Sequence, residues 1–197
     1  MLIKFEEIIT SIKKPITGIL HVGAHLCEEK ETYNANGISD TQIYWIEANP
    51  EIIQRAQERY PTANIYEGCI DTCDGVNKIF YITNNGQSSS ILRFGSHRMH
   101  YPSIRVSKRK NVKTIRLDTL IQKHNIPIEE INFLNLNIQG VELNALKSLD
   151  SYLNNIDYVY TEVNTEEVYK GCCKMSEIDD YLKMFGFERK KTKLYKN

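Results

Sequence analysis

The chain has 197 residues and no formal net charge, because 25 Lys and Arg residues balance 25 Asp and Glu residues. Hydrophobic residues make up 41% of it, with 10 Gly and 5 Pro, which excludes a disordered or fibrous chain and predicts a single domain over residues 1–197. The balanced charge gives no field that would attract phosphate backbones or anionic lipids, so it argues against nucleic acid as the main partner.

The sequence also lacks the features of an exported or membrane protein. Acidic residues within Met1–Glu7 stand where a signal peptide needs an apolar stretch, and no segment approaches the roughly 18 apolar residues of a membrane span. Five cysteines without a CxxC spacing predict free thiols in a reducing compartment. We therefore expect a cytoplasmic protein with no membrane partner.

In chain order, apolar runs rich in β-branched and aromatic residues alternate with amphipathic segments, which is typical of an α/β sheet. The expected strands cover residues 18–24, 43–48, 64–70, 133–138 and 158–163, and the expected helices cover 28–36, 50–60, 141–152 and 176–185. For the last helix we predict Ser176 as N-cap, Asp179 as its capping-box partner and Gly186 as the residue that ends it.

Residues 77–117 interrupt this alternation. Two segments, 78–83 and 112–117, alternate like strands, and the polar segment 84–90 lies between them. We predict an insertion that carries a loop, within one domain, because no repeat or linker marks a boundary.

The first candidate site lies where the first strand turns into the first helix, at His21–Glu28. Open α/β sheets bind ligands at the carboxyl ends of their strands, and Gly23 would permit a tight turn there. Only one glycine of the dinucleotide-binding G-x-G-x-x-G pattern is present, so a plain strand-to-helix turn is an alternative for this segment alone.

Glu47 strengthens this site because it ends the second strand, about 20 residues further on, where a carboxylate can accept the ribose hydroxyls of an adenosine group. The missing glycines argue against NAD, whose pyrophosphate must lie against bare backbone at a helix N-terminus. S-adenosylmethionine has no phosphates, so a looser turn containing His25 and Cys27 can serve it. The two segments together indicate an adenosine cofactor.

Six segments carry motifs in a fixed order. They are the glycine motif His21–Glu29, the acidic motif Trp45–Pro50, the serine-rich loop Asn84–Leu92, and the segments Leu117–Leu120, Leu134–Leu143 and Tyr160–Asn164. Together they resemble the S-adenosylmethionine-dependent methyltransferases of the FkbM type, over residues 18 to about 190.

This resemblance implies a Rossmann-like class I methyltransferase fold, with a mostly parallel central sheet, helices on both faces and an antiparallel edge. The chain has little room after residues 187–193 for the final antiparallel hairpin of such folds, so we expect a shortened C-terminal edge. The implied activity is transfer of a methyl group to oxygen, commonly a sugar hydroxyl, with a small molecule or glycan as acceptor.

The resemblance also implies a cofactor site. Gly23 and Ala24 would pass beneath the methionine part, Glu47 would hold the ribose, and Asp71 would accept from the adenine amine. The full expected set is His21, Gly23, Ala24, His25, Glu47, Ala48, Cys69, Ile70, Asp71, Ser88, Ser89 and Asn137.

Three positions depart from the family pattern. Family members often carry Asp where His21 stands, Gly where Cys27 stands and Asp where Asn137 stands. The last change removes a carboxylate from the expected methyl-transfer region. Two alternatives therefore stay open, a non-catalytic binding module with the same fold and a different adenosine-cofactor enzyme such as an oxidoreductase.

Methyl transfer to a hydroxyl needs a base, or a metal that acidifies the hydroxyl, because an alcohol does not ionise near pH 7. Glu142 and Glu162 are the carboxylate candidates, and Asn137 can orient the acceptor. Glu142 could instead only stabilise a helix start, and Glu162 could be a structural partner of a backbone amide. His100, with His97 three residues before it, is the imidazole candidate, unless both are surface loop residues.

A divalent metal is an open alternative, because the His97 and His100 pair lacks a matching third ligand in sequence. One basic cluster could hold an anionic acceptor such as a nucleotide sugar, or could be a solvated hairpin edge. It contains Arg105, Lys108, Arg109, Lys110, Lys113 and Arg116.

Overall fold

A computed structural model describes residues 2–194 of the chain. Its main sheet has five strands, all parallel, in the order β3-β2-β1-β7-β8. These strands are β1 (Ile19–Val22), β2 (Ile43–Glu47), β3 (Asn64–Glu67), β7 (Phe133–Leu136) and β8 (Tyr158–Thr161). The central strand is β1, where Ile19 pairs with Ile43 on one side and with Phe133 on the other. The predicted parallel sheet is confirmed.

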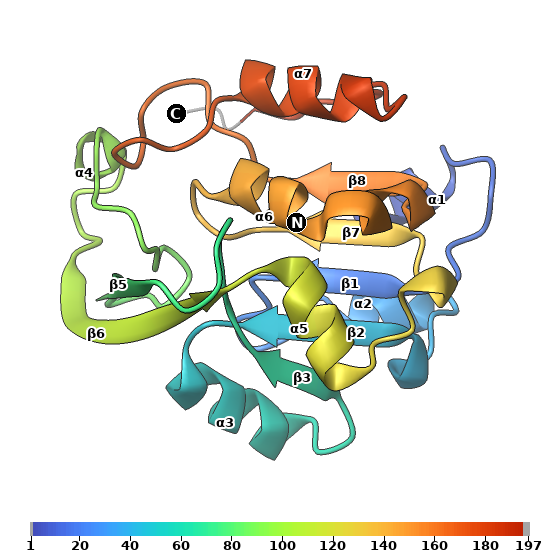
Figure 1. The fold of residues 1–197 in the computed structure, drawn as a ribbon, viewed down its shortest axis with the longest axis horizontal. Helices are drawn as coiled ribbons and strands as arrows, with labels where there is room; N and C mark the ends of the chain where they lie inside the picture. Colours follow the sequence, from blue (N-terminus) through green and yellow to red (C-terminus); the bar gives the residue numbers. More distant parts are fainter. Residues whose placement is uncertain (1, 195–197) are drawn as a thin grey trace.

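Helices cover both faces of this sheet (Figure 1). They are α1 (Phe5–Ile9), α2 (Lys30–Ala35), α3 (Pro50–Arg59), α5 (Leu117–His124), α6 (Glu142–Leu149) and α7 (Met175–Met184). Because side chains alternate along a strand, Leu20 and Val22 pack with α5, α6 and α7, while Ile19 packs with α1, α2 and α3 on the other face. The result is two hydrophobic cores, one on each face.

The termini of α3 and α7 follow ordinary capping chemistry. Pro50 begins α3, and the Asn49 side chain accepts a hydrogen bond from the backbone N–H of Glu51. Gly186 follows α7 with a φ of +80°, as predicted for the residue that ends this helix.

The predicted start of α7 is wrong by two residues. Its N-cap is Lys174, not Ser176, and the Lys174 backbone N–H donates to the Glu177 carboxylate at 2.9 Å. Glu177 therefore does what we expected of Asp179, which pairs with Arg189 instead.

The insertion supplies two strands of a second sheet, of order β4-β6-β5: β5 (Asn77–Thr83) and β6 (Val106–Ile115) belong to it, and β4 (Cys69–Ile70) precedes it. The β5–β6 pair is antiparallel and supplies the expected antiparallel strands, while β4 pairs with β6 in parallel. Within residues 2–194 the main sheet has no strand after β8.

The single strand predicted at residues 64–70 is in fact two strands in different sheets, divided at Gly68. A Cβ at Gly68 would lie 2.3 Å from Leu120 Cδ1 of α5, so a larger residue there would force the Leu120 side chain to move. The second sheet is thereby placed beside the carboxyl ends of the main strands, where the arrows in Figure 1 point.

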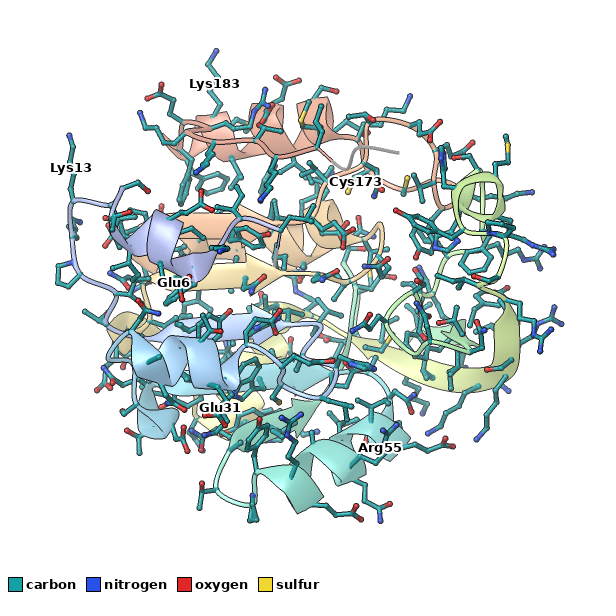
Figure 2. The ribbon with its side chains drawn as sticks, turned by 180° about the vertical axis from the view of Figure 1, so that it is seen from behind. Glu6, Lys13, Glu31, Arg55, Cys173 and Lys183 are labelled. Atoms are coloured by element: carbon teal, nitrogen blue, oxygen red, sulfur yellow. The ribbon has the colours of Figure 1, made fainter. Side chains whose placement is uncertain are left out.

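No helix in residues 2–194 is long and apolar enough to cross a membrane. All five cysteines are free thiols, as predicted, and Cys73 alone among them is exposed. Figure 2, seen from behind, shows the side chains of Lys13 and Lys183 extending away from the ribbon.

Candidate functional site

A cavity of about 760 Å³ lies at the carboxyl ends of the main strands, between them and the insertion. It brings together most of the residues predicted for the site, from segments far apart in the chain. Those that line it are His21, Gly23, Ala24, His25, Glu47, Ala48, Cys69, Ile70, Ser88, Ser89, His100, Asn137 and Glu162. Asp71 and Glu142 do not line it.

Gly23 is needed for a close approach of two backbone segments. Its φ is +88°, and a Cβ there would lie 2.0 Å from the carbonyl oxygen of Asn137. The glycine therefore lets the turn after β1 lie directly against the segment after β7. Cys27 in the same turn also has a positive φ, +55°, which explains why a glycine would suit its position.

The backbone N–H groups of this turn are all used within the protein. Gly23 and Ala24 both donate to the Ile46 carbonyl, and Cys27 donates to that of Ala24. The N–H of His25 donates to the carboxylate of Glu47 at 2.8 Å, and that of Leu26 to the carboxylate of Glu28 at 3.1 Å. No N–H group from residue 23 to residue 27 is left for a phosphate oxygen.

Glu47 joins the turn after β1 to the end of β2. Its Oε2 accepts from His25, and its Oε1 accepts from the backbone N–H groups of Ala48 and Asn49, all at 2.8 Å. Burial raises the pKa of Glu47, although these three donors favour the ionised form. A carboxylate has about four lone-pair positions, so one remains for a ligand in the cavity.

A buried polar group forms the floor of the cavity. The His21 imidazole lies 3.2 Å from the Tyr33 hydroxyl, and Asn135 Nδ2 donates to that hydroxyl at 2.8 Å. Burial lowers the pKa of His21 to about 4, so the ring is neutral near pH 7. Asn135 Oδ1 is buried and has no hydrogen-bond partner among the described residues.

Asn135 was missed by the sequence analysis, although a signal was present. It is the register partner of His21 on the neighbouring strand. A polar residue in the middle of each of two adjacent buried strands indicates a shared polar contact, because such groups must find partners.

Glu162 belongs to a hydrogen-bonded group that we call the Glu162 cluster, made of Glu162, Asn137, Gln139 and Tyr169. Gln139 Nε2 donates to Glu162 Oε2 at 2.8 Å and to Asn137 Oδ1 at 2.6 Å. Gln139 Oε1 accepts from the Tyr169 hydroxyl at 2.6 Å. Burial raises the pKa of Glu162, which brings this carboxylate closer to the range of a general base.

Replacing Tyr169 by Phe is expected to destabilise the protein by about 1–2 kcal/mol, because the hydroxyl that serves Gln139 and the Ser88 carbonyl is lost. Urea unfolding measures this change. Tyr152→Phe is the matched control, since its hydroxyl accepts only a long 3.4 Å contact from Gln122. Equal effects in the two variants would contradict a supporting role of Tyr169 in the Glu162 cluster.

Glu142 lies behind the cavity wall rather than in it. The side chain is 1% exposed, and its carboxylate accepts from the backbone N–H groups of Ile138 at 3.1 Å and Gly140 at 3.0 Å. Burial raises the pKa of Glu142 to about 7. These contacts hold the carboxylate against the 138–140 backbone, and its catalytic role stays a prediction.

Asp71, predicted to lie beside the adenine, does not line the cavity. Its carboxylate pairs with Lys78 at 2.5 Å and accepts from Asn144 Nδ2 and from the backbone N–H of Thr72, both at 2.8 Å. These contacts use the side chain between β4, β5 and α6. The preceding Cys69 and Ile70 do line the cavity.

The two histidines of the insertion lie on a single helical turn, α4 (His97–His100). The buried His97 ring stacks on Phe94 with the centroids 4.2 Å apart, and His100 Nε2 pairs with Glu166 at the cavity. Within residues 2–194 no group of three or more His, Cys, Asp or Glu side chains is placed to hold a metal ion.

The serine-rich loop is tied to both sides of the cavity. Ser89 Oγ donates to the Gly86 carbonyl at 2.6 Å, and Ser90 Oγ to the Gln139 carbonyl at 2.8 Å. Glu28 connects the loop to the turn after β1, because it contacts both His25 and Gln87. Burial opposes ionisation of Glu28, but the contact with His25 holds its pKa at about 2.

The basic cluster lies outside the cavity. None of its residues lines the cavity, and two of them pair with nearby carboxylates, Lys108 with Glu51 and Arg116 with Asp118. Its role in binding an anionic acceptor stays a prediction.

Comparison with known proteins identifies the family. The family model for the methyltransferase FkbM domain matches residues 21–189. The 2-O-methyltransferase NoeI of Sinorhizobium fredii (strain NBRC 101917 / NGR234) is 23% identical over 191 residues, which cover 91% of this chain and 76% of NoeI. A crystal structure of the methyltransferase FkbM from Methylobacillus flagellatus KT matches with a TM-score of 0.49 and 12% identity, over 78% of this chain and 35% of that one. The match across residues 21–189 means that this chain belongs to the FkbM methyltransferase family.

Proposed function

We propose that this protein is an S-adenosylmethionine-dependent O-methyltransferase that acts on a hydroxyl group of a sugar or glycan. Family membership supports methyl transfer. The relative NoeI is a 2-O-methyltransferase, which supports oxygen as the methylated atom. One combination of observations carries the proposal. The Glu47 carboxylate stands at the carboxyl end of β2 and lines the cavity, and the turn after β1 has no free backbone N–H group that could bind a phosphate.

The cavity fits S-adenosylmethionine better than a dinucleotide. Glu47 can accept from ribose hydroxyls, and Cys69 and Ile70 offer an apolar surface for the adenine. The pyrophosphate of NAD would meet no free backbone N–H in the turn, and α2 begins only at Lys30. When bound, S-adenosylmethionine supplies an electrophilic methyl group.

A second group of residues at the cavity suits a sugar acceptor. We call it the acceptor side and define it by Tyr101, Asn137, Gln139, Glu162 and Glu166. Aromatic rings beside amide and carboxylate groups are able to stack on a sugar ring and to hydrogen-bond its hydroxyls. Glu162 accepts the proton of the reacting hydroxyl, and Asn137 orients that hydroxyl.

The structure favours an enzyme over a non-catalytic binding module of the same fold. That alternative rested on Asn137, which stands where family members often carry Asp, and on Cys27, which stands where they often carry Gly. The adjacent Glu162 supplies a carboxylate to the same cavity, and Gln139 connects the two side chains. The missing carboxylate therefore has a replacement.

Replacing Glu47 by Ala is expected to weaken binding of S-adenosylmethionine by about 1.5–3 kcal/mol, because charge-assisted hydrogen bonds to the ribose are lost. Calorimetric titration with S-adenosylmethionine, S-adenosylhomocysteine and NAD measures this. Glu67→Ala is the matched control, since Glu67 is the register partner of Glu47 at the end of β3 but is exposed and outside the cavity.

Unchanged affinity in Glu47→Ala would refute this cofactor placement. Binding of NAD in preference to the other two ligands would favour an oxidoreductase. Glu47 also holds the turn after β1 through its contact with His25, so its replacement also affects stability. The thermal unfolding midpoint of each variant is therefore measured, and a loss of affinity is assigned to the ribose contact only where the variant is folded.

A further inference from the structure

One side chain of the Glu162 cluster uses its whole hydrogen-bonding capacity inside the protein. Gln139 Nε2 donates to Glu162 Oε2 at 2.8 Å and to Asn137 Oδ1 at 2.6 Å, which takes both of its amide protons. Gln139 Oε1 accepts from the Tyr169 hydroxyl at 2.6 Å. Gln139 therefore connects three side chains and has no amide proton left for a ligand.

The direction of these hydrogen bonds follows from the chemistry of Glu162. A base must be ionised to act, and an ionised carboxylate has no proton to donate. The Gln139 atom next to Glu162 is therefore the NH₂ nitrogen, and the oxygen of the same amide points to Tyr169. Because this nitrogen also lies next to Asn137, the Asn137 amide turns its oxygen toward Gln139 and keeps its own NH₂ group for other partners.

Two polar atoms of the acceptor side remain after these bonds are made. They are Asn137 Nδ2, a donor, and Glu162 Oε1, an acceptor, and neither has a hydrogen-bond partner within residues 2–194. Both side chains line the cavity, and both contact the same Gln139 nitrogen, so they are neighbours. The cavity wall thus presents a donor beside an acceptor.

A hydroxyl group matches this pair, because it donates one proton and also accepts through its oxygen. An ammonium group has only donors, so it would leave Asn137 Nδ2 without a partner, which is unfavourable in a desolvated site. During transfer, the proton of the matched hydroxyl goes to Glu162 and its oxygen forms the bond to the methyl carbon. The electron pair of the broken carbon–sulfur bond stays on sulfur.

We propose that Gln139 is a positioning residue that sets Asn137 as donor and Glu162 as acceptor, and that this pair selects a hydroxyl group over a protonated amine for methylation. This inference rests on the proposed function, because it concerns the acceptor of that same site. Gln139 acts through its two neighbours, since its own amide is fully used inside the Glu162 cluster.

Amide NMR signals test the assigned direction without turnover. Nitrogen-labelled protein is saturated with S-adenosylhomocysteine, and the side-chain NH₂ signals are assigned by their loss in Asn137→Asp and Gln139→Met. The protein is then titrated with methyl β-glucosaminide, a probe that carries hydroxyl groups and one amine. The probe is expected to shift the Asn137 signals and to leave the Gln139 signals nearly in place, because only the Asn137 protons are available to a ligand.

Unshifted Asn137 signals, or larger shifts at Gln139, would overturn the proposal. Failure of S-adenosylhomocysteine itself to bind would instead overturn the proposed function, and this inference with it. The two failures are therefore separated within one experiment.

Gln139→Met tests the positioning role, because Met has a similar length but cannot donate to Asn137 or Glu162. The rate of methyl transfer from tritiated S-adenosylmethionine to methyl β-glucosaminide is expected to fall about 10–100-fold, while affinity for S-adenosylmethionine changes by less than about twofold. Gln122→Met is the matched control, since Gln122 is exposed on α5 and lies outside the cavity. Equal rates in the two variants would refute the role of Gln139.

The pH profile separates positioning from a loss of structure. The hydrogen bond from Gln139 lowers the pKa of Glu162, against the effect of burial. The acid limb of the rate should therefore move to higher pH in Gln139→Met, whereas a loss of folded protein lowers the rate equally at every pH. Glu142, Tyr160 and Tyr169, whose pKa values the Glu162 charge raises, are the same in both proteins. An acid limb that does not move would contradict positioning by Gln139.

The methylated product reports the selection itself. Methyl β-glucosaminide offers oxygen and nitrogen in one molecule, so mass spectrometry of its product distinguishes the two sites of transfer. The wild-type protein is expected to methylate oxygen only, near neutral pH. Methylation of the nitrogen, or no transfer at all, would overturn the proposal.

Discussion

Glu162→Gln is expected to lower the rate of methyl transfer by about 10²–10⁴-fold while affinity for S-adenosylmethionine changes by less than about twofold. Gln has the shape of Glu and can still accept the 2.8 Å hydrogen bond from Gln139, but it cannot take the proton of a hydroxyl group. The rate is measured with tritiated S-adenosylmethionine and methyl β-glucosaminide. Glu166→Gln, assayed at saturating acceptor, is the control for removing a carboxylate from the same side of the cavity.

The pH profile identifies the base independently. Burial raises the pKa of Glu162 above its ordinary value of 4.5, and a base acts only when ionised. The wild-type rate should therefore rise with pH through a midpoint above 4.5 and then level off. This acid limb should disappear in Glu162→Gln and persist in Glu166→Gln. An acid limb retained in Glu162→Gln would assign the base to another group, with His100 as the next candidate at the cavity.

Gly23→Ala is expected to cost about 3 kcal/mol or more of folding free energy, which is the second large effect. A Cβ at this position would lie 2.0 Å from the carbonyl oxygen of Asn137, and both groups belong to backbone that cannot move independently. Urea unfolding measures the loss.

Gly37→Ala is an unusually close control. Gly37 has a φ of +87°, against +88° for Gly23, but an added Cβ would meet nothing within 4 Å. Both variants carry the same backbone strain, of about 1 kcal/mol, and only Gly23→Ala adds the steric contact. Similar losses in the two variants would contradict the close approach of the segments after β1 and β7.

The strands of the main sheet were predictable because buried parallel strands are apolar on both faces. Every residue of β1 and of β7 is buried, and both strands lie within the predicted ranges. The helix α5 was missed, although Leu117, Leu120 and Ile121 have helical spacing and are buried. The alternation of residues 112–117 favoured a strand up to residue 117, whereas β6 ends at Ile115 and α5 begins at Leu117.

Long-range pairing accounts for the other errors. Residues 64–70 read as one strand, because a sequence pattern does not tell which sheet each half joins. Only the glycine at position 68 marked the division. Similarly, Asp71 and Glu142 stand in motifs near strand ends, but their directions depend on Lys78, Asn144 and the 138–140 backbone.

The site residues that follow directly from strand ends were placed correctly at the cavity. Gly23, Glu47, Asn137 and Glu162 each stand at or just beyond the last residue of a parallel strand, so the sheet alone brings them together. Tyr169 could not be assigned in this way. Its contact with Gln139 joins two loops, and no periodic pattern carries that information.

The position of β1 at the centre of the sheet has a consequence for how the chain folds during synthesis. The ribosome delivers β1 and β2 early, but β7, the second neighbour of β1, emerges only after the whole insertion. Until then Ile19–Val22 presents an unpaired apolar edge, the kind of edge that recruits strands from other chains. We therefore expect nascent chains halted before residue 133 to aggregate or to bind chaperones, and release from both to coincide with the arrival of Phe133–Leu136.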